Sequence, residues 1–522
     1  MRIAFFMRNV GYIRNFEWVV RRLAQNGHSV LIYFDHEKKP VDRMMESSDK
    51  VAAEHMAVIQ AEYPKVKYAN LKGVFSKPRT VHSVAARRIR FILDYVRYLD
   101  PEFADAHKLR ERAAVFLRPK VRKLVDFFGR WRWSKALMIG TLATLERLIP
   151  PRRDVVEFLE RSRPKLVMVT PLFGHGSSQV DYFKACSHLG IRSALPVASW
   201  DNLTSKGAVQ CRPDSILVWN EAQKEEAVKL QHMPPERVHV TGAHSYQHWF
   251  SWEPSSDRPA FLLKAGLDPE RDFVVYLGSS RFIAEEEVPV ALAWARAIRA
   301  SDDPVLSRIG ILIRPHPQNY GDWMEVDLTE IGNAVVYPLG GANPVGRDAK
   351  SEYFDTMYHC RAVVGVNTSG LIEASILGKP VHTVLFDEMK ETQSGTLHFH
   401  HIAGEGEGFL RVARDLDEHT RLLAESIADP SQDEARDKAF VERFVWPKSI
   451  GDLPPVETFT QLITKQLHDP APKRGRAWLP LIWAGRVLAS PLLLIYWREH
   501  RDRVARNIER RRRIEEEKAA AL

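Results

Sequence analysis

The chain opens with a short apolar run, residues 2–7, that is typical of a strand buried in a parallel sheet. Apolar side chains then recur at helical spacing, at Phe16, Val19, Val20 and Leu23. Gly27 ends this predicted helix, and residues 29–34 form the next apolar run. The pattern predicts a strand, a helix and a second strand that is parallel to the first.

The same alternation resumes after residue 160 and again after residue 260. In the first half we expect further strands at residues 165–170, 192–198, 215–219 and 237–241. In the second half we expect strands at residues 273–277, 309–313, 334–337, 362–366 and 380–385. Because helices separate these strands, the pattern predicts an α/β fold with two doubly wound, mostly parallel sheets.

A turn-rich segment, residues 253–259, divides the two series. We therefore expect a first domain at residues 1–252 and a second domain at residues 260–470. Residues from about 80 to 163 carry helical periodicity without strand-like alternation, and they form a helical insert in the first domain. Residues 473–522 form a helical tail.

The positive charge is concentrated in the insert. The 522 residues contain 75 Lys and Arg against 66 Asp and Glu, a net charge of +9. Between Lys108 and Lys135, ten basic residues stand against two acidic ones, and aromatic side chains lie among them. This composition favours binding to an anionic membrane surface. Nucleic acid is not an expected partner, because the chain has no recognisable DNA-binding or RNA-binding module.

The tail contains a mostly apolar stretch, residues 477–497, in which Arg486 is the single charged residue. A charge at the centre of a bilayer costs about 2.5–3.5 kcal/mol, and both flanks of the stretch are basic. We therefore expect an in-plane or re-entrant helix that holds the protein peripherally on the inner face of the membrane. A helix packed against the protein is the alternative. Three widely spaced cysteines favour a reducing, cytoplasmic compartment.

Ligands of doubly wound sheets bind beyond the carboxyl ends of the strands, so the loops that follow the strands are the candidate site. In the first domain these loops are polar. On the acceptor side we expect Arg8, Asn9, Gly11, Trp200, Asn202 and Lys206. Two further side chains in these loops, His175 and Asp201, are candidates for catalysis.

In the second domain a helix begins directly after the expected strand 362–366. Its first residues, Thr368, Ser369 and Gly370, offer hydroxyl and backbone N–H groups to a phosphate, and the helix dipole favours negative charge there. Glu373, one turn further on, is placed to accept hydrogen bonds from ribose hydroxyls. The expected donor-binding set is completed by Gly278, Ser279, Ser280, Arg281, Arg314 and His316.

Two motifs of the second domain, Arg-Pro-His-Pro at 314–317 and Thr-Ser-Gly-x-x-Glu-Ala-x-x-x-Gly-Lys-Pro at 368–380, resemble those of the GT-B glycosyltransferase fold. Segment 368–380 is similar to the nucleotide-binding segment of UDP-N-acetylglucosamine 2-epimerases and CDP-glycerol glycerophosphotransferases. The second group also has an Arg-x-His-Pro element. The resemblance implies a nucleotide-activated donor in the second domain and a transfer that needs neither a metal nor a cofactor.

Residues 200–207 resemble the Trp-His-Gly segment, with a downstream Lys, of the glycerophosphotransferases, whose histidine is thought to act in catalysis. This chain has Asp201 at the place of the histidine. A carboxylate there suits a general base that removes a proton from an acceptor hydroxyl. His175 is the alternative base, and capping of the following helix is the alternative role for Asp201.

The histidine-rich segment at residues 396–402 does not indicate a metal site. His398, His400 and His401 lie in a stretch that we expect to be a strand or loop, without Cys or carboxylate partners at ligand spacing. The sequence as a whole predicts a membrane-associated transferase that moves a sugar or polyol phosphate to a cell-surface glycan or a lipid-linked acceptor. The alternatives are a sugar-nucleotide epimerase or hydrolase of the same fold, and a non-catalytic scaffold of glycan assembly.

Overall fold

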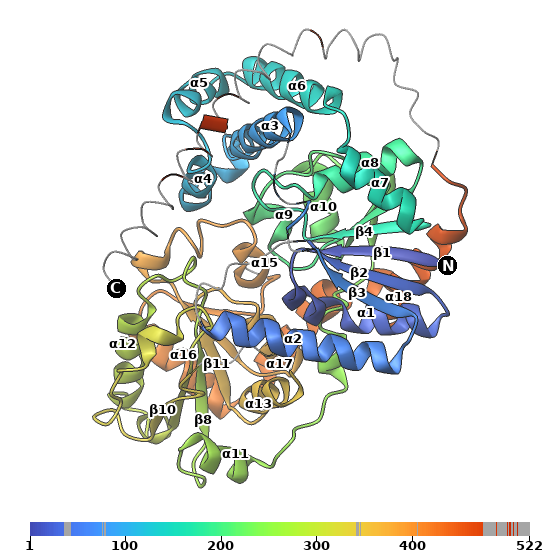
Figure 1. Cartoon of the computed structure of the whole chain (residues 1–522). Helices are drawn as coiled ribbons and strands as arrows, with labels where there is room; N and C mark the ends of the chain where they lie inside the picture. Colours follow the sequence, from blue (N-terminus) through green and yellow to red (C-terminus); the bar gives the residue numbers. More distant parts are fainter. Residues whose placement is uncertain are drawn as a thin grey trace, which may run out of the picture.

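Each predicted series of strands forms one parallel sheet, and the two sheets belong to two α/β domains (Figure 1). The predicted α/β fold with two doubly wound sheets is therefore confirmed. The structure is a computed structural model. It describes residues 1–472 except 36–42, 72, 76, 78, 79, 341–343, 345 and 405, together with residues 487, 498, 501, 502, 505 and 509.

In the described part of the chain the first sheet has seven parallel strands, in the order β3-β2-β1-β4-β5-β6-β7. They are β1 (Arg2–Met7), β2 (Ser29–Phe34), β3 (Val66–Asn70), β4 (Leu166–Thr170), β5 (Arg192–Pro196), β6 (Ser215–Val218) and β7 (Val238–Val240). Strand order changes direction at β1 and β4, so the loops after these two strands lie at the switch point where such sheets bind ligands.

Successive side chains of β1 pack on opposite faces of this sheet. Phe5 lies 5.0 Å, between ring centroids, from Phe16 of α1 (Ile13–Gln25). Phe6 stacks on Tyr182 of α8 (Val180–Leu189) with a centroid separation of 3.9 Å. Each side chain so buried stabilises the fold by about 1.5–3 kcal/mol, which explains why β1 is apolar at every position that faces a helix.

The second sheet has six parallel strands among the described residues, in the order β10-β9-β8-β11-β12-β13. They are β8 (Phe273–Leu277), β9 (Gly310–Arg314), β10 (Ala334–Val336), β11 (Ala362–Gly365), β12 (Val381–Val384) and β13 (Arg411–Ala413). Tyr276 of β8 packs on Trp294 of α12 (Glu287–Arg299), with centroids 5.3 Å apart. Val275, the preceding residue, belongs to the apolar cluster on the other face.

The remaining helices of the first domain are α2 (Arg43–Glu62), α9 (Asn202–Ser205) and α10 (Glu221–Lys229). Those of the second domain are α11 (Arg258–Ala265), α13 (Arg347–Tyr358), α14 (Gly370–Ile376), α15 (Phe399–Ala403), α16 (Leu416–Ala428) and α17 (Ser431–Phe440).

The insert is helical over its described residues, as its periodicity predicts. It consists of α3 (Val81–Arg97), α4 (His107–Ala114), α5 (Pro119–Gly129), α6 (Arg132–Leu148) and α7 (Arg153–Ser162). Arg90 of α3 donates hydrogen bonds to Glu146 of α6 at 2.7 Å and to Asp181 of α8 at 2.6 Å. Since all three side chains are buried, this ionic group ties the insert to the first domain.

The last described helix, α18 (Pro455–His468), returns to the first domain. Its apolar residues, such as Phe459 and Ile463, pack with α1 in the core on one face of the first sheet. Arg22 of α1 also forms a 2.7 Å ion pair with Glu457. The sequence-based division, which ended the second domain at residue 470, is wrong for this helix, because amphipathicity reveals a buried face without telling which sheet it covers.

The sequence pattern does not predict strands β3 and β13, and both lie at a sheet edge. In β3 only Val66 is buried, so the strand lacks the apolar run that marks a central strand. Most of the apolar tail, residues 477–497, lies outside the described residues. Among the described helices, none is both long enough and apolar enough to cross a membrane.

Candidate functional site

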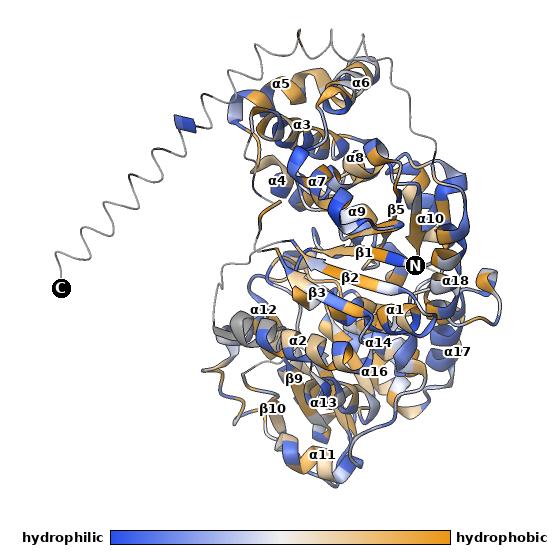
Figure 2. Ribbon diagram, turned by 45° about the vertical axis from the view of Figure 1, so that its right-hand side comes forward, coloured by the Kyte–Doolittle hydropathy of each residue, from blue (hydrophilic) through white to orange (hydrophobic). Residues whose placement is uncertain are grey.

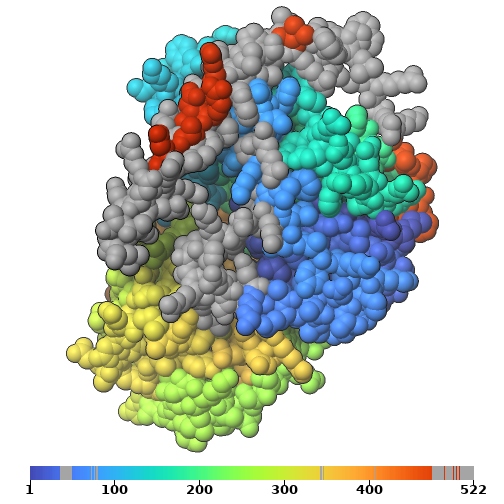
Figure 3. Space-filling view, in the orientation of Figure 1, coloured from blue at the N-terminus to red at the C-terminus, as the bar shows by residue number. Residues whose placement is uncertain are grey.

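Residues that follow strands of both sheets meet at the junction of the two domains. Trp200, after β5, and Tyr246, after β7, share one buried cluster with Leu371 of α14 in the second domain. An ion pair of 3.0 Å between Glu17 of α1 and Lys350 of α13 adds a second contact. Figure 3 shows residues of the second domain, in yellow and orange, directly against blue residues of the first. The junction therefore brings the candidate loops of both domains together.

The loop after β11 presents the predicted nucleotide-binding residues. Thr368 is half-buried and Ser369 is exposed, so both hydroxyls lie near the surface of the junction. Gly370 is buried, and a Cβ added to it would lie 2.7 Å from the hydroxyl oxygen of Tyr353. The close packing excludes any larger residue at the start of α14. The Tyr353 hydroxyl donates to Oε2 of Glu373 at 2.6 Å and fixes that carboxyl group.

The carboxyl group of Glu373 titrates near neutral pH. Burial raises its pKa to about 7, against the opposing effects of the Tyr353 hydrogen bond and the charge of Arg14. Arg14 belongs to α1 of the first domain, so a cation of one domain acts on a carboxyl group of the other. We did not predict Arg14 from the sequence, because it lies inside an amphipathic helix and belongs to no motif.

His316, in the loop after β9, offers a hydrogen-bond donor. Burial lowers its pKa to about 4, and the charge of Arg14 adds to this effect, so the imidazole is neutral at pH 7. Its Nδ1 accepts a hydrogen bond of 3.1 Å from the backbone N–H of Gln318. The remaining proton therefore lies on Nε2, where it is available to a phosphate oxygen.

Gly278 allows the loops after β8 and β9 to approach each other. A Cβ at this position would lie 2.8 Å from the backbone nitrogen of His316. Ser280 is half-buried, and Arg281 is exposed with its guanidinium 3.2 Å from Asp322. An exposed pair of this kind contributes little to stability, so Arg281 is available to a ligand.

Two of the predicted phosphate contacts, Ser279 and Arg314, are buried within their own domain. Ser279 is fully buried, and its backbone N–H donates to both carboxylate oxygens of Glu287, at 2.8 and 2.9 Å. Arg314 is also buried; it donates to Thr356 at 3.0 Å and lies 3.5 Å from Glu352. Both residues therefore build the donor-side loops from within and do not face the junction.

The carboxylate of Asp201 is fully engaged by its own loop. It accepts hydrogen bonds from Ser199 at 2.6 Å, Ser205 at 2.7 Å and Asn202 at 3.1 Å, and Lys206 lies 3.6 Å away. Burial opposes ionisation, yet the charge of Lys206 and these hydrogen bonds hold the pKa of Asp201 well below its usual range. Asp201 is therefore a permanently ionised and weak base. It stands at the start of α9, without a side-chain hydrogen bond to the helix backbone.

Helix α3 of the insert holds both candidate catalytic loops. Arg97 donates to the backbone oxygen of Lys206 at 2.8 Å. Asp94 accepts from the backbone N–H of Gly176 at 2.7 Å and from that of Ala208 at 2.9 Å. The insert thus fixes the positions of the His175 and Asp201 loops relative to each other.

His175 is the less satisfied of the two candidate bases. Neither of its ring nitrogens has a hydrogen-bond partner among the described residues, although both atoms are buried. Asp94 is 3.9 Å from Nδ1, beyond hydrogen-bonding distance. Burial, with the charges of Arg112 and Arg97, lowers the pKa of His175 to about 4. The imidazole is therefore neutral at pH 7 and free to accept a proton.

The predicted acceptor-side residues divide into two groups. Arg8 is exposed, and its guanidinium lies 3.2 Å from the place of a Cβ on Gly174. Asn9 and Gly11 are half-buried in the same turn, where the side-chain oxygen of Asn9 fills the space next to Gly11. Lys206 is partly exposed. These four residues lie at the accessible edge of the first sheet.

Trp200 and Asn202 form the second group of predicted acceptor-side residues, and both are buried. Trp200 packs edge-on against His398 of the second domain, with ring centroids 5.0 Å apart. Burying the indole ring at the junction favours the packed domains over separated ones. Asn202 lies below the loop and binds Asp201.

The histidine-rich segment of the second domain also reaches the first. It begins the short helix α15, whereas we expected a strand or loop. Nδ1 of His398 lies 3.2 Å from the hydroxyl of Thr204, and Nε2 of His401 lies 2.6 Å from Glu226. We did not predict these contacts between domains, because the local sequence does not indicate which residues of the other domain the histidines contact. The described residues contain no group of His, Cys, Asp and Glu arranged to hold a metal ion.

Comparison with known proteins rests on structure, since no protein-family model and no curated protein sequence matches the chain. A glycosyltransferase from Rickettsia africae ESF-5 superposes with a TM-score of 0.50 at 8% identity, over 90% of this chain and 99% of that one. The chain has the GT-B fold. The resemblance of the sequence to this fold is therefore confirmed.

Two other solved structures align with lower scores. UDP-GlcNAc 2-epimerase from Methanocaldococcus jannaschii aligns with a TM-score of 0.48 at 12% identity, over 89% of this chain and 100% of that one. The wall teichoic acid polymerase TagF aligns with a TM-score of 0.44 at 10% identity, over 89% and 88% of the two chains. Such low identities leave the reaction of this GT-B chain to be argued from its own residues.

Proposed function

We propose that this GT-B chain is a membrane-associated transferase that moves a sugar or polyol phosphate from a nucleotide-activated donor to a cell-surface glycan or a lipid-linked acceptor. The observation that carries the proposal is the junction itself. The second domain contributes neutral or cationic hydrogen-bond donors, and the first domain contributes an imidazole without a hydrogen-bond partner among the described residues and the exposed Arg8.

The donor nucleotide binds the second domain. Ser369, His316 and Arg281 donate hydrogen bonds to the diphosphate, and Glu373 accepts from the ribose hydroxyls. Arg14 supplies positive charge from the first domain, in place of the buried Arg314. Donors aimed at the charge that develops on the leaving nucleotide lower the barrier without a metal ion.

We infer that His175 is the general base and that Asp201 positions its loop. His175 is neutral at pH 7 and neither ring nitrogen has a hydrogen-bond partner among the described residues, whereas the carboxylate of Asp201 already accepts three hydrogen bonds and faces Lys206. Removal of a proton from the acceptor hydroxyl lets its oxygen attack the donor carbon or phosphorus as the bond to the nucleotide breaks. The proton passes to His175 and the electron pair to the nucleoside diphosphate or monophosphate.

An epimerase of the same fold is the main alternative. An epimerase acts on a soluble nucleotide sugar and needs neither an acceptor side nor a membrane surface. The insert is better explained by an acceptor, because α3 and α4 contact the candidate loops and α5 and α6 carry exposed aromatic residues. A transferase releases nucleotide only when an acceptor is added, whereas an epimerase converts its substrate without one. Measuring turnover with and without acceptor therefore distinguishes the two functions.

The membrane contact is assigned to an aromatic patch on α5 and α6. This patch consists of large exposed side chains: Leu124, Phe127, Phe128, Trp131, Trp133 and Leu137. Figure 2 shows apolar, orange segments along these two helices at the outer edge of the molecule. Lys120, Lys123, Arg130 and Arg132 are exposed on the same two helices. Apolar rings among cations are suited to an anionic lipid surface.

Fewer cations serve this surface than the sequence alone indicates. Lys135 pairs with Asp100, and Arg122 pairs with Glu111. Arg112 donates to the backbone oxygen of Ser205. These three side chains hold the insert together or tie it to the loop after β5. Each of the four exposed cations, Lys120, Lys123, Arg130 and Arg132, is expected to contribute about 1 kcal/mol at an anionic surface.

The double variant Trp131→Gln, Trp133→Gln is expected to bind anionic liposomes several-fold more weakly than the wild type at low salt. The measurement is flotation of the full-length chain with liposomes of anionic or of neutral lipid, at low and at high salt. Trp18→Gln, which alters an exposed tryptophan on α1, is the matched control and is expected to float like the wild type. A wild-type chain that remains unbound under every condition would contradict membrane association.

A further inference from the structure

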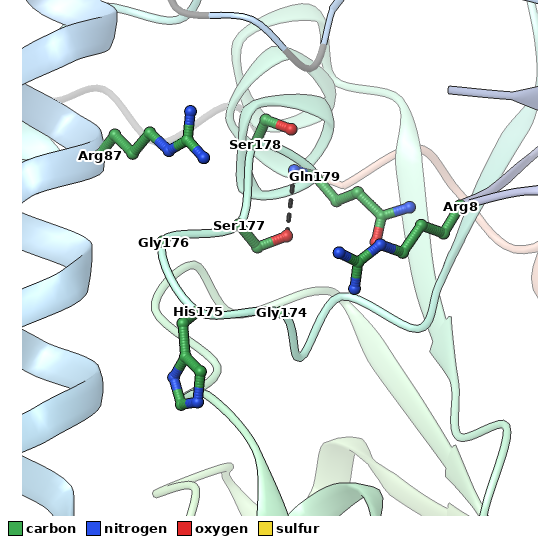
Figure 4. A pocket seen from close by; sticks show the side chains of 8 residues that line it. All are labelled: Arg8, Arg87, Gly174, His175, Gly176, Ser177, Ser178 and Gln179. Atoms are coloured by element: carbon green, nitrogen blue, oxygen red, sulfur yellow. Dashed lines mark hydrogen bonds between the residues drawn. The ribbon is translucent and has the colours of Figure 1, made fainter. Parts of the chain in front are cut away.

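A small pocket lies between the insert and the first sheet. It is lined by Arg8, which follows β1, by Arg87 of α3, and by the loop 174–179 that follows β4 (Figure 4). Its volume is about 60 Å³. On a scale of about 10–15 Å³ for each water molecule, this volume accommodates a group the size of one phosphate and is too small for a sugar ring.

The pocket is positively charged and has no acidic lining residue. Among the ion pairs of the described residues, none includes Arg8 or Arg87. Arg90, one turn further along α3, shows the opposite arrangement, since Glu146 and Asp181 neutralise its guanidinium. Partial desolvation, together with the charge of Arg90, lowers the pKa of Arg87, and a bound anion would favour the charged form of this guanidinium.

Two backbone acceptors of the loop are already occupied. The backbone oxygen of Ser177 is taken by Arg90 at 3.0 Å, and that of Ser178 by the backbone N–H of Asp181 at 3.0 Å. The Ser177 hydroxyl oxygen accepts from the backbone N–H of Gln179 at 3.3 Å, which leaves its proton free. Two guanidinium groups and two serine hydroxyls thus remain to bind a ligand.

We propose that this pocket binds a phosphate group carried by the acceptor. Two guanidiniums and two hydroxyls match the charge and the several oxygens of a phosphate better than those of a single carboxylate. Every lining residue belongs to the first domain, so the pocket is separate from the residues assigned to the donor nucleotide. This assignment to the acceptor rests on the proposed function, whereas phosphate binding itself does not.

The position of the pocket also suits an acceptor that His175 activates. His175 belongs to the same loop, and Figure 4 shows its ring on the other side of the backbone from the guanidinium of Arg8. A phosphate bound between Arg8 and Arg87 fixes one end of the acceptor, which restricts where the attacked hydroxyl lies. The insert thereby contributes both a wall of the site and one of the two phosphate ligands.

The test measures binding of two probes, inorganic phosphate and farnesyl phosphate, to the full-length chain by isothermal titration calorimetry. Arg8→Gln and Arg87→Gln are each expected to weaken binding of both probes at least tenfold, and Arg87→Lys is expected to restore part of the loss. Arg147→Gln removes one charge from an exposed position of α6 and is the matched control, with affinity unchanged. Circular dichroism of each variant verifies folding.

The two probes distinguish the sources of the phosphate. Tighter binding of farnesyl phosphate supports a lipid-linked acceptor, and equal binding supports a phosphorylated glycan. Unchanged affinity in both arginine variants would overturn the proposal, as would displacement of the probes by a nucleoside diphosphate that binds the same site. If the protein binds phosphate through both arginines but binds no nucleoside diphosphate, the proposed function is contradicted. The proposed phosphate subsite is then still supported.

Discussion

His175→Gln is expected to lower kcat by at least a hundredfold while leaving nucleotide binding intact. A positioned general base contributes about 10²–10⁴-fold to the rate, and glutamine keeps the approximate size of the side chain without its basic nitrogen. The proposed nucleotide contacts do not include the His175 loop, so the affinity for a nucleoside diphosphate should not change. The measurements are kcat with a nucleotide-activated donor and nucleotide affinity from the melting temperature.

Asp201→Asn is the comparison that separates the two candidate bases. The asparagine cannot accept all the hydrogen bonds that Ser199 and Ser205 donate to the carboxylate, so we expect a lower melting temperature and a higher KM. The loss in kcat is expected to be smaller than for His175→Gln. Full activity of His175→Gln, together with loss of activity in a stably folded Asp201→Asn, would assign the base to Asp201 and contradict our inference.

Nucleotide affinity is expected to increase by about tenfold as the pH rises from 6 to 8, because Glu373 must lose its proton to accept from both ribose hydroxyls. Burial raises the pKa of this carboxyl group to about 7. Below that pH the carboxyl group is protonated. The ribose hydroxyls then no longer donate to an ionised acceptor, and the complex loses about 1.5–3 kcal/mol of stabilisation in total. Titration of a nucleoside diphosphate at several pH values gives the profile.

Glu373→Gln provides the matched control for this profile. Its amide is close in shape to the carboxyl group and does not titrate, so the affinity should be weak and independent of pH between 6 and 8. Tyr353, whose hydroxyl binds Glu373, remains able to donate to the amide oxygen, which keeps the local structure. An unchanged pH profile in this variant would assign the titration to another group and remove Glu373 from the nucleotide site.

The apolar pattern predicts the central strands because a parallel strand is buried on both faces. β8, for example, is apolar at all five of its positions and fully buried. The same reasoning does not reach β3 and β13, whose exposed edges need no apolar side chains. It also does not show that α18 returns to the first sheet, since that choice depends on packing between residues hundreds of positions apart.

The candidate site divides in the same way. Thr368 and Glu373 lie after a buried strand and at the start of a helix, as the sequence predicts, because the strand, a glycine and the helix fix that loop locally. Ser279 and Arg314 occupy the predicted loops but turn inward, because their partners, Glu287 and Glu352, belong to neighbouring helices. A motif gives the position of a side chain along the chain; its direction depends on contacts that the motif does not contain.

Acceptor-dependent transfer tests the central claim most directly. Purified full-length protein is incubated with nucleotide-activated sugars or with nucleotide-activated polyols. Each donor carries a label on the group that is to be transferred, and a lipid extract is either added as the source of acceptor or left out. The account predicts that for one donor the label enters the lipid or glycan fraction, and that nucleotide release needs the extract. It also predicts that His175→Gln abolishes both. Conversion of the donor to an epimer without any acceptor, or the absence of transfer from every donor, would contradict it.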